Sequence, residues 1–418
     1  MDINRYNDDI IYDEIIIGCG IAGLYWYWKT KPSNFLILEK SDRIGGRVFN
    51  IDWNGYQISL GGGIIKSSNE LTIKLCNELD LELGNSISKY HLIDLETRTK
   101  NINKPNEDNF HKSNKIITKY LKKTFKKNKE QIKKNKLTWN EFLDLYLDLK
   151  TSTTIKSNLL YKSYSDANIE SVFEHEIGEL LRTEDFKVQY IKQSGYTGLL
   201  NKLIESVNRS NIQTNNEVTH IIKKDNLFKI TTKQNQTFTA KKIILATESK
   251  TNINFEFNEQ INMDLNNLYR MVSGSNYIRV YSYHKETHGL ECSYRSNGLV
   301  GKVIIINPNI IMCCYTEESQ AVELNNLLSK NSKQEQIEIV YKLLINYSIP
   351  IKTKPDDIIC KYWSTGIHFN TIEYDKEEKN NLQKKLKDSN IIVIGESIAD
   401  SHGWVNSALE SVDFIYSL

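Results

Sequence analysis

The sequence predicts an α/β protein (α+β overall), in which a discontinuous Rossmann-like domain is interleaved with an inserted domain of mixed β-sheet and helices. Three observations lead to this fold class. The chain has 418 residues, more than the roughly 250–300 at which a single hydrophobic core stops growing. A short apolar strand, a glycine-rich turn and a helix stand near its start. Similar apolar runs recur after long intervals, as expected when one sheet is assembled from distant segments.

The first of these elements form a strand–helix–strand unit. Residues 14–17 (EIII) are a short apolar run, which predicts a strand buried on both faces. A helix is expected from Ala22 to about Lys29, because Pro32 then ends it. Residues 35–38 (FLIL) provide the second parallel strand and complete a βαβ unit.

Later strands of the same sheet are expected at residues 242–246 (KIILA) and 391–394 (IIVI). Between them lie a mostly helical segment and a segment with β-rich runs, such as residues 277–283 and 303–311. We assign a nucleotide-binding domain to residues 10–90, 194–251 and 387–418, and a substrate-binding domain with a helical insertion to residues 91–193 and 252–386.

Composition narrows the class of protein. With 39% hydrophobic and 25% charged residues, and no apolar run near the roughly 18 residues that span a bilayer, we expect a soluble protein. The polar start lacks the basic and apolar parts of a signal peptide. The six cysteines have neither zinc-site spacing nor disulfide density, so we expect no metal site and a cytoplasmic or other reducing compartment. The adjacent Cys313 and Cys314 are expected as buried thiols of one strand.

One segment departs from the nearly neutral net charge of +2. Between Lys112 and Lys136 the sequence is strongly basic. Apolar residues recur in it at roughly helical spacing, at Ile116, Ile117, Leu121 and Phe125. We interpret the segment as a solvated helix face with one apolar stripe, and a patch that binds nucleic acid or another anionic surface is the alternative.

A glycine triplet follows the first strand and opens the first helix. In this G-x-G-x-x-G pattern the first glycine permits a tight turn, the second lets the backbone approach a diphosphate, and the third lets helix and strand pack closely. Glu39 ends the second strand, where its carboxylate would accept hydrogen bonds from both ribose hydroxyls of an adenosine. The residues expected to hold the nucleotide here are Gly18, Gly20, Ile21, Ala22, Gly23, Glu39 and Lys40.

A second turn, RIGGR, contains Arg43, Gly45, Gly46 and Arg47. Because it contains this turn as well as the glycine triplet, the sequence resembles the two-domain flavoproteins that include the flavin-containing amine oxidases. The chain resembles a divergent member of the flavin-containing amine oxidase family. The resemblance implies that this turn lies against the diphosphate and the flavin of FAD, with the arginines supplying positive charge. Their guanidinium groups suit phosphate oxygens, and a plain NAD dehydrogenase has no need of this second motif.

Two further segments continue the resemblance. Gly61 and Gly62, in the LGGG run, fall where the family has a turn near the flavin ring, although Ser59 replaces the usual acidic residue. Val218 resembles the valine whose backbone meets the adenine. The hairpin after it leads to IILATES, which corresponds to the strand that closes the nucleotide domain in this family.

The end of the chain carries the most specific block, GESIADSHGWVNSALES. By resemblance, Gly395 and Glu396 lie at the ribityl chain, where Glu396 makes the contact. The backbone of Gly403, Trp404 and Val405, at a helix N-terminus, faces the N1 and C2 carbonyl side of the flavin. A helix dipole there stabilises the negative charge that develops on flavin reduction.

The substrate side departs from the family in three positions. Trp404 matches one wall of the aromatic cage that holds the amine in this family, and Trp363 matches a tryptophan near the flavin ring. Ile367 stands where covalently flavinylated members have cysteine, which implies noncovalent FAD. His368 replaces the second aromatic wall, either as a polar, pH-sensitive group or as a packing histidine, and Arg279 aligns with the lysine that positions a water near N5.

These residues predict an FAD-dependent oxidoreductase that oxidises an amine or amino acid by hydride transfer to flavin N5. Reoxidation by O2 would release H2O2. Lys66 lies in the segment that lines the substrate channel of the family, where a cation would disfavour polyamines and tolerate a carboxylate; a solvated lysine is the alternative. Two other functions stay open, namely a C–C desaturase or protoporphyrinogen-oxidase-like dehydrogenase, and a flavin-binding structural or interaction protein.

Overall fold

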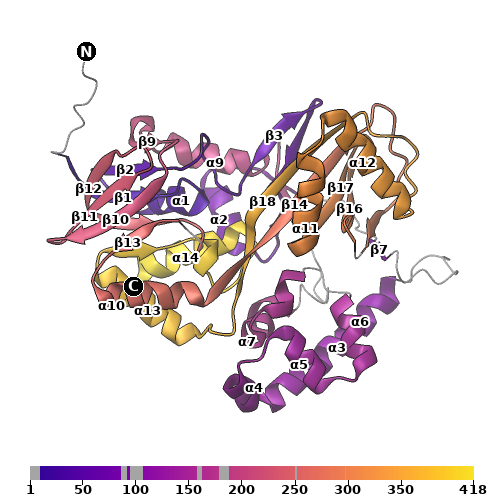
Figure 1. Cartoon of the computed structure of the whole chain (residues 1–418), viewed down its shortest axis with the longest axis horizontal. Helices are drawn as coiled ribbons and strands as arrows, with labels where there is room; N and C mark the ends of the chain where they lie inside the picture. Colours follow the sequence, from indigo (N-terminus) through magenta and orange to yellow (C-terminus); the bar gives the residue numbers. More distant parts are fainter. Residues whose placement is uncertain are drawn as a thin grey trace.

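The computed structural model describes residues 10–85, 92–94, 107–157, 162–177, 188–249, 252–296 and 298–418. Three parts are visible in Figure 1: a large sheet flanked by helices, a second sheet covered by α11 (Glu318–Ser329) and α12 (Lys333–Asn346), and a separate helical unit. The proposed domain boundaries near residues 90 and 251 lie outside the described residues.

The large sheet contains the nucleotide-binding strands. They are β1 (Ile11–Ile17), β2 (Phe35–Leu38), β9 (Ile212–Gln213), β10 (Val218–Lys224), β11 (Leu227–Thr232), β12 (Thr237–Leu245), β13 (Asn254–Glu256) and β19 (Ile391–Val393). Their order is β13-β10-β11-β12-β1-β2-β9, with β19 paired to β12. Because β1 runs parallel to β2 and β12, and β19 runs parallel to β12, the expected assembly of one sheet from distant segments is confirmed.

Helices cover both faces of this sheet. They are α1 (Ile21–Thr30), α2 (Glu70–Glu78), α9 (Gly195–Glu205), α10 (Glu259–Arg270), α13 (Lys376–Asp388) and α14 (Val405–Ser417). Ile16 of β1 packs into the layer that contains α1, α9 and α14, whereas its neighbours Ile15 and Ile17 pack against α10 and α13. Alternate residues at the end of β1 thus enter two cores, which explains why residues 15–17 are all apolar. In sequence, α10 lies within the segment proposed for the substrate domain, yet it packs on the nucleotide sheet.

The second sheet has the order β18-β14-β17-β16-β15-β7. Its strands are β7 (Leu92–Asp94), β14 (Val272–Tyr283), β15 (Ser293–Arg295), β16 (Lys302–Asn307), β17 (Ile310–Glu317) and β18 (Asp357–Asn370). The expected β-rich run at residues 303–311 is confirmed: it forms β16 and the start of β17, which pair antiparallel across a turn at Pro308 and Asn309. Cys313 and Cys314 are buried free thiols of β17, as expected.

The helical unit forms its own hydrophobic core. It comprises α3 (Glu107–Lys127), α4 (Lys129–Asn135), α5 (Trp139–Tyr146), α6 (Leu149–Ser157), η1 (Lys162–Asp166) and α7 (Ile169–Ser171). Leu121 and Phe142 are fully buried, and Phe369 of β18 joins them, which ties the unit to the second sheet. The expected apolar stripe is wrong at Ile116, whose side chain is 71% exposed because it lies on the side of α3 away from this core. Side chains of α3 before residue 116 lie outside the described residues.

Two small sheets complete the fold. They contain β3 (Asn50–Trp53) with β4 (Tyr56–Ser59), and β5 (Ile65–Lys66) with β8 (Val188–Ile191) and β6 (Leu83–Asn85). The β3–β4 hairpin leads directly into the LGGG run. Among the residues that the structure describes, no helix combines the length and apolar character needed to cross a membrane.

Candidate active site

The turn between β1 and α1 is closely packed against neighbouring backbone. Gly18 has φ +105°, and a Cβ there would lie 2.5 Å from the carbonyl oxygen of Ala246 at the end of β12. A Cβ on Gly23 would overlap the carbonyl oxygen of Gly18. Gly45 donates its N–H to the carbonyl of Cys19 at 2.9 Å, so the RIGGR turn is joined to this first turn. A side chain at Gly18 or Gly23 would therefore distort the first turn or displace it from β12.

Two helices begin at this region with open ends. The residues before them, Gly20 for α1 and Trp404 for α14, have no side-chain oxygen, and neither first turn contains Asp or Glu. In the part of the chain that the structure describes, no protein group accepts a hydrogen bond from the N–H groups of residues 21–23 or 405–407. Both ends therefore present free N–H donors and the positive end of a helix dipole, which suit an anionic or electron-rich ligand.

Glu39 is oriented at the end of β2 by neighbouring donors. Its Oε2 accepts a hydrogen bond from the backbone N–H of Cys19 at 2.8 Å, and its Oε1 accepts two from Ser41 at 2.7 and 2.9 Å. Asn216 donates its backbone N–H to the Glu39 carbonyl, and its own buried Oδ1 has no hydrogen-bond partner among the described residues. Asn216 was not predicted from the sequence, because a lone asparagine in a loop gives no pattern to detect.

The other predicted adenosine contacts differ in exposure. Val218 is 7% exposed and is the first residue of β10. The register of the β10–β11 pairing shifts between Val218 and His220, so the backbone hydrogen bonds of Val218 depart from the regular ladder. Lys40 lies at the surface, where its Nζ is 3.3 Å from a Glu248 carboxylate oxygen. Val218 is thus part of the buried turn region, and Lys40 is at its edge.

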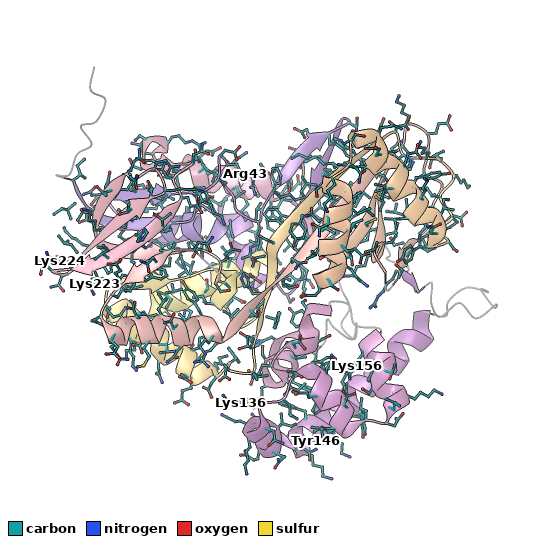
Figure 2. All side chains as sticks on the ribbon, in the orientation of Figure 1. Arg43, Lys136, Tyr146, Lys156, Lys223 and Lys224 are labelled. Atoms are coloured by element: carbon teal, nitrogen blue, oxygen red, sulfur yellow. The ribbon has the colours of Figure 1, made fainter. Side chains whose placement is uncertain are left out.

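The side chain of Arg43 stabilises the RIGGR turn by hydrogen bonds. Its guanidinium donates to the carbonyls of Ile44, Gly46 and Val48. The same group lies 4.2 Å from the ring centroid of Phe49, and burial lowers its pKa. Figure 2 shows Arg43 between the nucleotide sheet and the second sheet. The side chain thus fixes the turn that would face a diphosphate, with part of its donor capacity already used.

A buried carboxylate connects the three segments predicted to face the flavin. Glu396 accepts hydrogen bonds from Arg47 Nη1 at 2.6 Å, from the Gly403 N–H at 2.8 Å and from the His368 N–H at 3.2 Å. Its Oε2 also lies 2.7 Å from His368 Nδ1. Burial alone would raise the pKa of Glu396, but Arg47 and His368 hold it well below its ordinary value, so the carboxylate is ionised.

This arrangement defines the position of His368. Its side chain is fully buried and turned toward Glu396, whereas its Nε2 has no hydrogen-bond partner among the described residues. Because Glu396 is ionised, Nδ1 carries the proton of their hydrogen bond. The neighbouring Ile367 packs against the core of the helical unit instead.

Residues of the second sheet hold the LGGG run from the other side. Arg279 donates to the Gly61 carbonyl, Trp363 Nε1 to the Leu60 carbonyl at 2.9 Å, and Tyr281 to the Ser59 carbonyl at 2.6 Å. Gly62 follows in this run and donates its N–H to the Arg47 carbonyl at 3.0 Å. Arg279 and Trp363 therefore position the turn predicted to face the flavin ring.

Two tyrosines line the same wall and were not predicted. The rings of Tyr277 and Tyr315 meet edge to face at 5.7 Å, and each lies about 5 Å from the Arg279 guanidinium. Burial alone would lower the pKa of Arg279, but these tyrosines hold it above its ordinary value. A Cβ on Gly366 would overlap the Tyr277 ring, which explains that glycine. The period-two alternation of residues 277, 279 and 281 along β14 could have placed Tyr277 on the same face as Arg279, but it gives no signal for Tyr315.

Trp404 has a cationic neighbour. The Lys66 Nζ lies 4.0 Å from the centroid of its ring, so these two sequence-predicted residues are in contact. A cation at this distance from an aromatic face makes a favourable interaction. The carboxyl-terminal block thus comes together with the LGGG segment.

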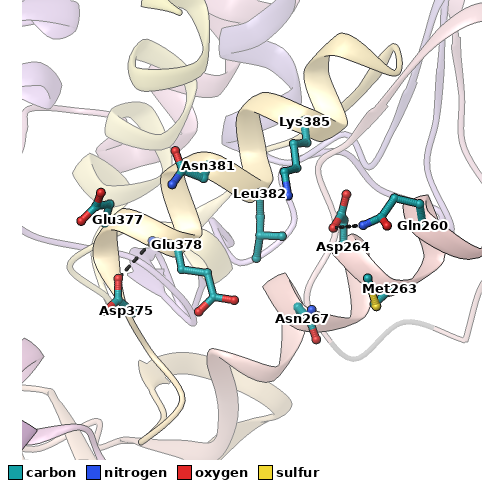
Figure 3. A pocket seen from close by; sticks show the side chains of 10 residues that line it. All are labelled: Gln260, Met263, Asp264, Asn267, Asp375, Glu377, Glu378, Asn381, Leu382 and Lys385. Carbon is teal, nitrogen blue, oxygen red and sulfur yellow. Dashed lines mark hydrogen bonds between the residues drawn. The ribbon is translucent and has the colours of Figure 1, made fainter. Parts of the chain in front are cut away.

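A separate groove lies away from these residues. It has a volume of about 430 Å³, lies between α10 and α13, and is lined by Gln260, Met263, Asp264, Asn267, Asp375, Glu377, Glu378, Asn381, Leu382 and Lys385 (Figure 3). Asp264 accepts a hydrogen bond from Gln260, and Asp375 accepts one from the Glu378 N–H. None of the predicted site residues lines this groove.

The parallel sheet, the glycine turns and the two open helix ends together define a dinucleotide-binding protein. A family model described as flavin containing amine oxidoreductase matches residues 29–411, and the chain belongs to that family. It is therefore a flavin-dependent, amine oxidase-like oxidoreductase.

Individual relatives match in different ways. A probable flavin-containing monoamine oxidase A from Dictyostelium discoideum is 32% identical over 74 residues, which span 17% of this chain and only 16% of that protein. The structure of wild-type putrescine oxidase bound to putrescine has a TM-score of 0.72 at 13% identity, over 98% of this chain and 99% of that chain. A mutant of the same enzyme gives 0.72 at 13% identity over 98% and 100%. At such identity these structures show the shared fold, and the predicted fold class is confirmed.

Proposed function

We propose that the chain binds FAD noncovalently and oxidises a small amine or amino acid. The observation that carries this proposal is the pair of open helix ends, α1 and α14, at the two glycine-containing segments that resemble the family. When bound, FAD would take a hydride equivalent at N5 from the carbon beside the amine nitrogen and pass the electrons to O2, yielding imine and hydrogen peroxide.

The nucleotide side supplies groups of the right chemistry. The N–H groups at the start of α1 suit the diphosphate. The Glu39 carboxylate accepts three hydrogen bonds from protein donors and can still accept further ones from ribose hydroxyls. Asn216, with its unsatisfied Oδ1 beside Glu39, is a further candidate at this end. We assign Gly18, Gly20 and Gly23 to close approach of the cofactor.

The start of α14 suits the pyrimidine end of the flavin. Its free N–H groups would stabilise negative charge there. Glu396 would position this end, because it binds the N–H of Gly403 and also fixes Arg47 and His368. Ile367 offers no thiol for a covalent flavin bond, which supports noncovalent attachment.

The substrate would meet aromatic side chains. Tyr277 and Tyr315 form one wall, and Trp404 contributes another surface. Apolar rings exclude water and disfavour the charged ammonium form, so they favour the neutral amine that can lose a hydride. Arg279, held by the Gly61 carbonyl, would orient the turn beside the reacting atoms rather than act as a proton acceptor.

Anaerobic mixing of the purified, flavin-loaded protein with monoamines, diamines and amino acids tests this function. We expect at least one of these substrate classes to reduce the flavin, which bleaches its longest-wavelength absorbance band. Admitting O2 should then restore the absorbance with release of hydrogen peroxide. The Trp404→Ala variant should retain the flavin but bleach more slowly. Full retention of colour with every amine, together with bleaching by a C–C substrate such as a reduced porphyrin, would replace amine oxidation by dehydrogenation.

A further inference from the structure

The long helix α3 presents two different faces. Thr118, Leu121 and Phe125 lie on the face that packs into the core of the helical unit. Since an α-helix turns by about 100° per residue, the opposite face carries residues 116, 119, 120, 123 and 127 within an arc of about 100°. We call this set, Ile116, Lys119, Tyr120, Lys123 and Lys127, the α3 face. All five side chains are exposed.

The charge of the α3 face is of one sign. Lys122 and Lys126 flank it and are also exposed, and the sequence from residue 116 to 127 contains no Asp or Glu. None of these five lysines forms an ion pair with a residue that the structure describes. In the next helical segment, by contrast, Lys133 pairs with Asp375 and Lys136 with Glu373. Among the described residues, the lysines at positions 119, 122, 123, 126 and 127 thus keep their charge uncompensated.

Two apolar side chains lie within this positive surface. Ile116 is 71% exposed and Tyr120 is 52% exposed, one helical turn apart. A tyrosine and an isoleucine among lysines suit the boundary between lipid headgroups and acyl chains, where apolar and cationic groups are both stabilised.

We propose that the α3 face docks the protein on an anionic lipid bilayer. Clusters of four to eight lysines attract anionic headgroups, and Ile116 and Tyr120 would enter the interface beside them. A nucleic-acid partner fits less well. Residues 112–136 contain no arginine, the side chain suited to bidentate contact with phosphates and bases.

Vesicle co-sedimentation of the full flavin-loaded chain tests the proposal. We expect binding to vesicles of phosphatidylcholine mixed with phosphatidylserine, no binding to phosphatidylcholine alone, and loss of binding as salt is raised. At about fivefold per lysine, the triple variant Lys119→Gln, Lys123→Gln, Lys127→Gln should bind roughly a hundredfold more weakly. The variant Ile116→Ser, Tyr120→Ser should weaken binding without changing the charge.

The matched control removes three exposed lysines at or after other helices, Lys330→Gln, Lys342→Gln and Lys384→Gln, and should bind vesicles like the parent. Flavin content and amine-dependent bleaching should be equal in all variants, so the proposal is separable from the enzyme function. It is overturned if the control and the α3 variant lose binding equally, or if the parent ignores anionic vesicles. Binding of an RNA oligonucleotide that is stronger than vesicle binding and lost in the α3 variant would also overturn it in favour of nucleic acid.

Discussion

The two halves of the candidate active site satisfy their polar groups in opposite ways. On the nucleotide side, the backbone N–H groups at the starts of α1 and α14 are left open. On the side of the second sheet, Arg279, Trp363 and Tyr281 already donate to backbone carbonyls of the 59–61 turn. One half is therefore prepared for a ligand by its backbone, and the other is a framework of side chains that holds a turn in place.

Helices elsewhere in the molecule sharpen the contrast. The helix α5 begins with Thr138, whose hydroxyl accepts a hydrogen bond from the Glu141 N–H, and α12 begins with Ser332, which caps the Glu335 N–H in the same way. Such capping boxes stabilise a helix start by satisfying its free donors. Their absence from α1 and α14 costs stability, which a bound cofactor would restore.

The largest effect should come from the packing of the first glycine turn. Gly23→Val would drive its side chain into the Gly18 carbonyl, so we expect a cost of about 3 kcal/mol or more and little flavin-loaded protein. Gly55→Val is the control, because no atom lies within 4 Å of an added Cβ there; its positive φ, which Gly23 lacks, adds backbone strain but no collision. Flavin absorbance per mole of protein measures both. Equal flavin content in the two variants would show that the tight packing around Gly23 is not required for flavin binding.

A smaller but still large effect is expected at Glu396. Glu396→Gln leaves Arg47 with a weaker partner in a buried site, which should cost about 3 kcal/mol and loosen the flavin. Because the folded pKa of this carboxyl lies below its ordinary 4.5, its stabilising contribution is present above that pH and is lost as pH falls through the lower folded value. Urea denaturation of both proteins at neutral and acidic pH measures this. A constant difference between them throughout the acidic range would contradict the ion-pair account.

Glu39→Ala should affect the cofactor more than the fold. Loss of its charged hydrogen bonds to the ribose should weaken FAD binding by about 1.5–3 kcal/mol, or roughly ten- to hundredfold in Kd. Ultrafiltration with flavin fluorescence measures the retained fraction, and Glu248→Gln serves as a nearby acidic control. If Glu39→Ala retains FAD as the parent does, the carboxylate only ties Cys19 and Ser41 in place.

The smallest effect is expected at the edge of the site. Lys40 pairs with Glu248 in a largely exposed position, so Lys40→Gln should change the free energy of unfolding by less than about 0.5 kcal/mol. Retained FAD should also stay close to that of the parent. If Lys40→Gln lost as much FAD as Glu39→Ala, this would indicate that Lys40 contacts the cofactor directly.

The backbone turns of the nucleotide side could be predicted from the sequence, whereas the side-chain contacts of the second sheet could not. The βαβ unit and the glycine turns were predictable, because sterics leave few residues able to occupy positions such as Gly18 and Gly23. The orientation of His368 toward Glu396 was not, since residues 28 apart are joined only by tertiary packing. Tyr315 was missed for the same reason, as it becomes part of the wall only when β17 pairs with β14.

We propose that the two open helix ends hold FAD without a covalent bond. Denaturing the purified protein and separating it from small molecules tests this most directly. We expect about one FAD per chain, all of it released into the filtrate, and full reloading when the refolded protein is given FAD. Flavin that stays with the denatured chain, or a chain that takes up no FAD under any refolding condition, would contradict it.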